Sequence, residues 1–83
     1  MAWDDRAARI DHDGPDLLWR QVADDIRASI ESGELPPGAK LPSEHDLADI
    51  YQVARVTIRA AIQHLRDSGL VTVTLGRGTY VRR

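Results

Sequence analysis

The sequence predicts a mainly α-helical fold with a small β-hairpin at its end, an α+β class. Apolar residues recur at every third or fourth position in three segments between residues 17 and 68, which is the period of helices that share one core. After residue 69 they alternate instead, as in a half-buried strand. With 83 residues, 42% of them hydrophobic, the chain is long enough to bury one core, so we expect a single domain.

Local signals set the expected ends of the three helices. The first is predicted over residues 17–32 and is followed by a glycine, which favours a helix C-terminus. The second opens at Ser43, whose hydroxyl can accept a hydrogen bond from the backbone N–H three residues later, and ends near Gln52. The third is predicted over residues 55–68, again with a glycine after it.

The predicted hairpin joins residues 70–74, which are rich in β-branched side chains, to residues 79–81. Gly76-Arg77-Gly78 forms its tip. Two helices separated by a short break and followed by a hairpin make a three-helix winged helix-turn-helix, which we expect over residues 15–83.

The residues before this domain carry no helical or strand period. Residues 1–14 are therefore expected to form a flexible acidic arm that ends in the turn-forming Asp13-Gly14-Pro15. We expect the arm residue Trp3 to pack loosely on the domain rather than to form a dimer contact.

The charge is divided unevenly along the chain. The formal net charge is −2, yet residues 1–53 hold five basic against twelve acidic side chains, a balance of −7. Residues 54–83 hold six basic side chains against Asp67 alone, a balance of +5. Because a polyanion responds to the local field more than to the total charge, the second half is a candidate nucleic-acid surface.

Several classes of protein and of site are excluded or disfavoured. The absence of Cys removes disulfides and thiolate chemistry. No apolar run reaches the roughly 18 residues of a membrane span, and the acidic N-terminus is unlike a signal peptide, so we expect a cytoplasmic protein.

Ser43, His45 and Asp46 begin one helix and point in different directions, so we expect no enzyme. Asp11, His12 and Asp13 lie on the arm, so we expect no metal site and no cofactor.

The third predicted helix carries the candidate contacts. At 100° per residue, Arg55, Arg59 and Arg66 fall within roughly 40° of one another, beside the apolar face, and Thr57 lies in the first turn. Arg binds guanine or phosphate, and Thr meets phosphate or a thymine methyl. The helix alone leaves open an ordinary solvated face. Arg77 between two glycines at the hairpin tip favours DNA, because such a tip can approach a phosphate or enter a minor groove.

Four spaced motifs carry a resemblance to a known family. They are Leu-Pro-Pro-Gly-Ala-Lys-Leu-Pro-Ser-Glu (residues 35–44), Val-Ala-Arg-Val-Thr-Ile-Arg-Ala-Ala-Ile-Gln-His-Leu (53–65), Gly-Leu-Val (69–71) and Gly-Arg-Gly-Thr-Tyr-Val (76–81). Together they closely resemble the DNA-binding domain of the GntR family of bacterial transcription regulators. The resemblance runs from about Asp16 to Val81.

The resemblance implies that the chain binds a palindromic double-stranded DNA operator as a homodimer, with one recognition helix in each half-site. Residues 55–68 would enter the major groove and the wing, residues 75–79, would lie at the minor groove. The DNA-binding positions that the resemblance implies are Ser43, Glu44, His45, Ala54, Arg55, Thr57, Arg59, Gly76, Arg77 and Gly78.

The chain departs from the family pattern at four places. Ala54 stands where Ser or Thr is usual, which loses a hydroxyl able to cap the helix. His45 replaces a common Arg, and Gln52 replaces the usual turn glycine. Members normally continue into an effector-binding and dimerisation domain, whereas this chain ends at Arg83. It is either an excised domain or a stand-alone miniature regulator, which we favour because the acidic arm looks native; we expect no small-molecule effector site in it.

The function predicted from these observations is sequence-specific DNA binding by a transcription regulator. We expect it to repress transcription and to be associated with the bacterial nucleoid. Two alternatives stay open. One is a winged helix used as a protein-interaction module, with Asp24, Asp25 and Glu31 of the first helix as its docking surface. The other is a non-specific architectural DNA binder, which is disfavoured because about six cations neutralise few phosphates.

Overall fold

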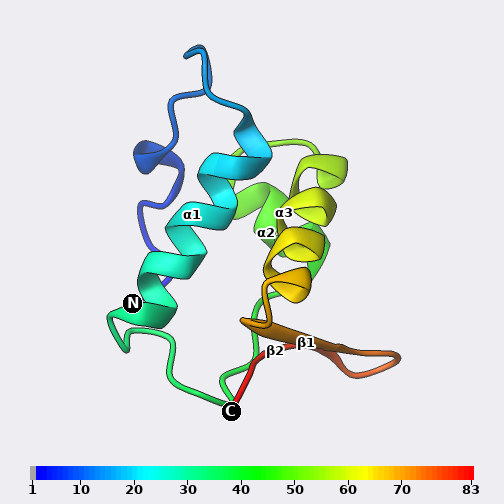
Figure 1. Ribbon diagram of the computed structural model, residues 1–83. Coiled ribbons are helices and arrows are strands. Elements are labelled where there is room, and N and C mark those ends of the chain that lie inside the picture. Colours follow the sequence, from blue (N-terminus) through cyan, green and yellow to red (C-terminus); the bar gives the residue numbers. More distant parts are fainter. Residues whose placement is uncertain (1) are drawn as a thin grey trace.

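The computed structural model describes residues 2–83 and confirms the three helices and the terminal hairpin (Figure 1). The helices lie against one another, and the hairpin projects from one end of the bundle (Figure 1). The elements are a short 3-10 helix η1 (Ala7–Arg9), α1 (Leu18–Glu31), α2 (Glu44–Tyr51), α3 (Arg55–Asp67), β1 (Val71–Thr74) and β2 (Gly78–Val81).

The core lies where α1, α2 and α3 meet. Val22 and Ile26 of α1 and Ile58 and Leu65 of α3 are completely buried, because the helical period places them on the facing sides of the two helices. Burying each such side chain stabilises the fold by roughly 1.5–3 kcal/mol. Residues from α2, the loops and the two strands extend the core: Leu35, Leu41, Leu47, Ala48, Tyr51, Val71 and Val81.

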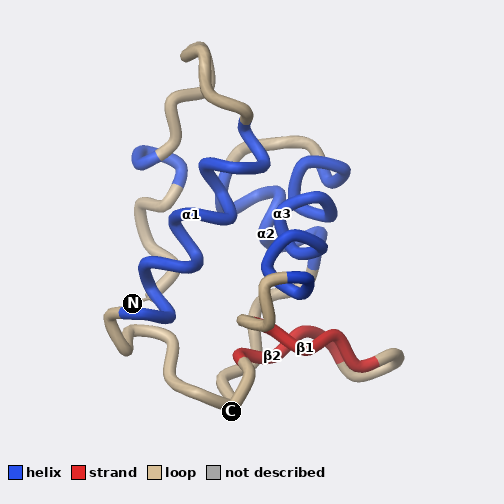
Figure 2. The backbone as a smooth tube through the Cα atoms, viewed as in Figure 1, coloured by secondary structure: helices blue, strands red, loops and turns tan. Residues whose placement is uncertain are grey.

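The two strands are joined to the body through the loop that precedes α2 (Figure 2). β1 and β2 pair antiparallel, with Val71 opposite Val81 and Thr74 opposite Gly78. The loop adds a partial third strand, because the Leu41 N–H donates to the Thr79 carbonyl at 2.8 Å and the Val81 N–H donates to the Ala39 carbonyl at 2.8 Å. The base of the wing is therefore fixed, and only its tip extends freely.

The residues before α1 pack against the bundle, which differs from the loosely ordered arm predicted from the sequence. Arg6 is completely buried and Ile10 is part of the core. Trp3 is half-buried, and the Arg6 guanidinium lies over its ring, with Arg6 Cζ 4.5 Å from the ring centroid. Hydrophobic periodicity does not reveal this packing because the residue that fixes it is charged.

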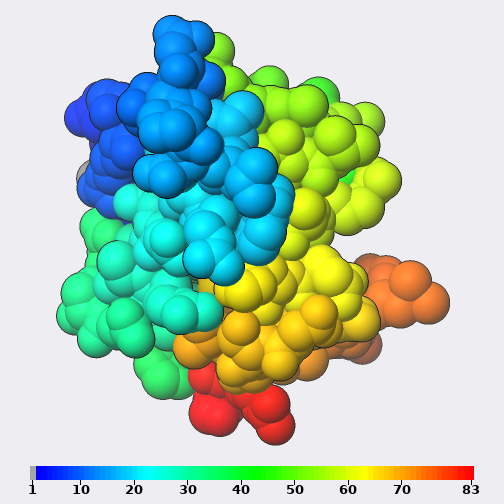
Figure 3. Space-filling model, turned by 45° about the horizontal axis from the view of Figure 1, so that its top comes forward, coloured from blue at the N-terminus to red at the C-terminus, as the bar shows by residue number. Residues whose placement is uncertain are grey.

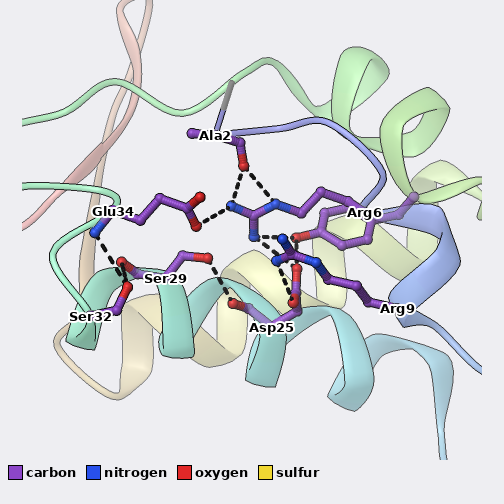
Figure 4. Close-up of polar contacts among 8 residues, drawn as sticks. Ala2, Arg6, Arg9, Asp25, Ser29, Ser32 and Glu34 are labelled. Carbon is purple, nitrogen blue, oxygen red and sulfur yellow. Dashed lines mark hydrogen bonds and ion pairs between the residues drawn. The ribbon is translucent and has the colours of Figure 1, made fainter.

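A cluster of polar groups around Arg6 holds the arm to α1 and α2 (Figure 4). Its guanidinium donates to Asp25 Oδ2 of α1 at 2.8 Å and to Glu34 Oε1 at 3.1 Å, and it also bonds the Ala2 carbonyl. The Tyr51 hydroxyl, at the end of α2, donates to the same Asp25 oxygen at 2.7 Å. Burial raises the pKa of Asp25, but the hydrogen bonds from Tyr51 and Arg6 outweigh it and hold that pKa below its usual range.

Replacing Arg6 should destabilise the fold strongly. Arg6→Ala removes the donor from a partly buried carboxylate, and we expect a loss on the order of 3 kcal/mol in the free energy of unfolding, measured by urea denaturation. Arg9→Ala is the matched control, because Arg9 binds the same Asp25 carboxylate at 3.2 Å but is 45% exposed. It should cost about 0–1 kcal/mol. Equal losses in the two variants would contradict the assignment of Arg6 as the buried anchor.

The lowered pKa of Asp25 predicts a specific dependence of stability on pH. A carboxyl with a folded pKa below its unfolded value of about 3.9 stabilises the fold above that value and loses its contribution as pH falls through the folded pKa. The stability difference between the natural chain and Asp25→Asn should therefore be constant from about pH 5 to 7 and shrink below about pH 4. Urea midpoints at several pH values measure it, and a difference that does not change with pH would refute this account.

Candidate nucleic-acid interface

The turn between α2 and α3 sets the position of the candidate recognition helix. Gln52 adopts a left-handed conformation (φ 58°), and its side-chain amide donates to the Asp49 carbonyl at 2.7 Å. The Val53 N–H donates to the Ala48 carbonyl at 3.1 Å. Gln52 thus accepts a geometry that normally favours glycine, and its side-chain hydrogen bond offsets part of the strain.

The first turn of α3 is presented at the surface. Ala54 is the N-cap residue and supplies no side-chain hydrogen bond, so the N–H groups of this turn have no side-chain cap. Arg55 and Arg59 are exposed, and Thr57 is half-buried. The helix ends at Asp67, one residue before the predicted end, and Ser68 is its C-cap. This geometry places Arg55 beside the positive end of the helix dipole, where no side chain caps the backbone N–H groups, an arrangement that attracts anions.

Arg59 is held by an acidic partner from the neighbouring helix. Its Nε and Nη2 atoms donate to Glu44 Oε2 at 3.1 Å and to Glu44 Oε1 at 2.8 Å, a two-bond fork. The hydrogen bond from Arg59 holds the pKa of Glu44 below its usual range. The pair orients the guanidinium on the surface and joins the start of α2 to α3.

The other predicted residues of α2 are exposed at its N-terminus. The Ser43 hydroxyl accepts a hydrogen bond from the Asp46 N–H at 3.1 Å, which confirms the predicted cap. His45 is exposed, and its Nε2 lies 3.8 Å from an Asp49 carboxylate oxygen one turn later. The His45 side chain thus lies along α2, toward Asp49 rather than toward α3.

The tip of the wing is built by residues with unusual backbone angles. Gly76 has φ +78°, and nothing lies within 4 Å of the position that a Cβ would occupy. Gly78 has φ +128°, a backbone conformation that favours glycine, and a Cβ there would lie 2.9 Å from Lys40 Cε, so the end of that flexible side chain would have to move. Arg77 between them is exposed.

Two recesses connect these residues into one face. One, of about 280 Å³, separates α3 from the wing and is lined by Glu44, Arg59 and Arg66 on the helix side and by Val73 and Thr79 on the wing side. In the space-filling view the wing tip (orange) projects beyond the body, and a gap separates it from the start of α3 (Figure 3).

The second recess, of about 640 Å³, lies between the base of the wing, the start of α2 and the arm. Arg77, Lys40, Ser43 and Trp3 line it. Because the two recesses share Pro42, Glu44 and Thr79, Arg59 and Arg77 belong to one continuous surface. Sequence reasoning did not select Lys40 or Trp3. A cation beside the Leu-Pro-Ser motif was the available signal for Lys40, and nothing in the sequence pointed to Trp3.

The family model of the bacterial regulatory proteins of the gntR family matches residues 18–81, which include α2, α3 and the wing but not the arm. The chain belongs to the GntR family. Its curated relatives include the mannosyl-D-glycerate transport/metabolism system repressor MngR of Escherichia coli, 45% identical over 65 residues that cover 78% of this chain and 27% of that protein. The chain thus spans about a quarter of the length of this relative.

Solved structures of GntR-family proteins share the fold. YtrA from Sulfolobus acidocaldarius, described as a GntR-family transcription factor, is 36% identical with a TM-score of 0.83, over 89% of this chain and 78% of that one. AraR(DBD) in complex with operator ORE1 is 38% identical with a TM-score of 0.73, over 76% of this chain and 77% of that one.

In this GntR domain, five of the ten predicted site residues line the two recesses: Ser43, Glu44, Arg59, Arg77 and Gly78. Arg59 of α3, the start of α2 and the wing border the surface that these recesses form, whereas Arg55 and Thr57 of the first turn of α3 line neither recess. The contacts of all these residues with DNA stay predictions. Within residues 2–83, no group of His, Asp and Glu has the arrangement of a metal site. His12 of the arm contacts the Tyr51 carbonyl at 2.9 Å through its Nε2. No helix in this part of the chain is both long and apolar enough to cross a membrane.

Removing the carboxylate partner should release Arg59 of this GntR domain. Glu44→Gln leaves an uncharged, weaker acceptor, so we expect the Arg59 Nε–H group to become more mobile on the picosecond–nanosecond timescale. ¹⁵N relaxation of the arginine Nε–H signals measures this. Asp49→Asn, a change of the same charge at an exposed position of the same helix, is the control and should leave Arg59 unaffected. Unchanged Arg59 relaxation in Glu44→Gln would show that the fork does not hold this side chain.

Proposed function

We propose that this GntR-family domain is a sequence-specific DNA-binding regulator that represses transcription. The observation that carries the proposal is that Arg59 of α3 and Arg77 of the wing line two adjoining recesses of one face, in a chain whose net charge is −2. A protein that needed only solubility would not gather its cations there. The likeness to AraR(DBD), solved with operator DNA, supports this use of the face.

The geometry supports a division of tasks between the two elements. A helix is the element that a major groove admits, and α3 presents Arg55 and Thr57 in its exposed first turn. The wing carries Arg77 at an extended tip with glycine on each side, which suits the narrow minor groove and its negative potential. The recess between α3 and β1 leaves room for the sugar-phosphate backbone that separates the two grooves.

The proposal extends to the assembly and its place in the cell. One domain covers only a few base pairs, so tight binding at physiological salt requires two copies on a palindromic operator. We therefore propose a homodimer on DNA, acting in the bacterial cytoplasm on the nucleoid. Repression follows because a domain seated on an operator excludes other proteins from that DNA, and the relative MngR is described as a repressor.

In vitro selection from random duplex DNA at near-physiological salt tests this proposal. A recovered palindrome with half-sites about one helical turn apart, or less, would support the dimeric regulator. Enrichment of a single half-site would remove the homodimer from the proposal and leave sequence-specific binding. Binding without enrichment would favour the architectural alternative, and a folded sample that binds no DNA would favour a protein-interaction module.

Arg55→Ala is expected to lower the affinity for the selected operator by about 1–3 kcal/mol and to relax the preference at one base position. Arg20→Ala on α1 is the matched control, because it removes the same charge from an exposed side chain that lies over the Trp19 ring, 5.6 Å from its centroid. Fluorescence anisotropy on operator variants measures both effects. If the two variants lose the same affinity without any change in base preference, α3 is not the reading helix.

A further inference from the structure

Within residues 2–83, four large apolar side chains are substantially exposed, and three of them lie on α3 or the wing. The four side chains are Leu17, which precedes α1, and Val56, Val73 and Leu75. Val73 lines the recess between the wing and α3, and Leu75 lies at the wing tip. Val56 differs from both, because it lies in the first turn of α3 between Arg55 and Thr57 and is 65% exposed.

Val56 points directly away from the core. At 100° per residue, it lies roughly 170° around the helix from the centre of the buried residues Ile58, Ala61 and Leu65. The outermost line of α3 therefore begins with Val56 and continues one turn later with Ala60, which is also exposed. Arg55 lies to one side of this line.

The next position on the same line is already engaged. The Gln63 side-chain amide donates to Asp67 Oδ1 at 3.0 Å, one turn further along the helix. The first two turns of the outermost line thus offer methyl groups, and the third offers an amide that has an internal partner. A surface of this kind cannot read a base by hydrogen bonds at its centre.

The major groove offers one apolar group for such a surface. Among the base edges exposed there, only thymine carries a methyl, at C5, and the other groups are hydrogen-bond donors and acceptors. A valine has no polar atom and only one strongly preferred χ1 rotamer in a helix, so it loses little conformational freedom on contact. Burying its methyl groups against polar base edges would leave those edges without partners.

We propose that Val56 is a specificity-determining residue that contacts the C5-methyl group of one thymine in each operator half-site. The inference rests on the proposed function, because it requires α3 to enter the major groove. Arg55 and Val56 then read neighbouring positions by different chemistry, the first through hydrogen bonds and the second through shape and the exclusion of water.

Deoxyuridine provides a test at the level of a single methyl group. In the selected operator, each thymine of one half-site is replaced in turn by deoxyuridine, which removes only the C5-methyl. We expect the natural chain to lose affinity by about fourfold at one position, the equivalent of one buried carbon. Val56→Ala should bind the thymine operator more weakly and lose almost no further affinity at that deoxyuridine. A cytosine there should weaken binding, and 5-methylcytosine should recover part of the loss.

Two variants serve as controls. Val73→Ala also shortens an exposed valine, but on the wing, and should keep the full sensitivity to deoxyuridine. Thr57→Ser removes the neighbouring methyl group of α3, and this variant should also keep the full sensitivity to deoxyuridine. Because Val56 is exposed, its replacement by Ala should not unfold the domain, which circular dichroism checks.

The outcomes separate this inference from the proposed function. If an Arg55-dependent operator is recovered but no thymine is sensitive to loss of its methyl, the inference on Val56 fails and the regulator remains. The inference on Val56 also fails if Val56→Ala still loses the full affinity on replacement of thymine by deoxyuridine. It fails likewise if Thr57→Ser no longer loses affinity on that replacement. If selection recovers no sequence, the proposed function fails and the inference with it.

Discussion

The buried contact between Arg6 and Asp25 is the constraint on which the arrangement of the helices depends. Asp25 of α1 receives hydrogen bonds from Arg6 of the arm and from Tyr51 at the end of α2. Three segments therefore meet at one carboxylate. Burying charge costs desolvation, so such a cluster adds little net stability but penalises arrangements that leave one of its members unpaired. It fixes α2 against α1, and α2 in turn carries the turn that begins α3.

A second ion pair lies at the other end of α2, at its first residue, and has a different consequence. The Glu44–Arg59 fork is exposed, so solvent and salt screen it and its effect on stability is small. Its effect is on orientation, because a fixed guanidinium loses less conformational entropy when it meets an external anion. A phosphate arriving at this surface must also compete with the Glu44 carboxylate, which discourages loose binding in many registers.

Much of the fold was predictable from the sequence because it depends on local patterns. The helical period located α1, α2 and α3 to within a residue or two, and the Ser43 cap follows from the residue types around it. The packing of the arm was not predictable, because Arg6 finds its partners 19 and 45 residues away and a buried arginine carries no periodic signal. The same holds for the fork of Arg59, whose partner lies 15 residues earlier. The family motifs indicated the candidate positions of the site, whereas the hydrogen-bond partners of those residues within the domain could be identified only from the fold.

The position of Trp3 has a practical consequence for work with this protein. It lines the recess that also contains Arg77 and Ser43, so the chain just after its first residue runs beside the surface assigned to DNA. A purification tag or fluorescent fusion joined to the arm ahead of Trp3 would lie close to this recess. It would compete sterically with a duplex, and a basic tag would add affinity of its own. Labels placed on the exposed face of α1, at Asp24 or Ala28, avoid this site.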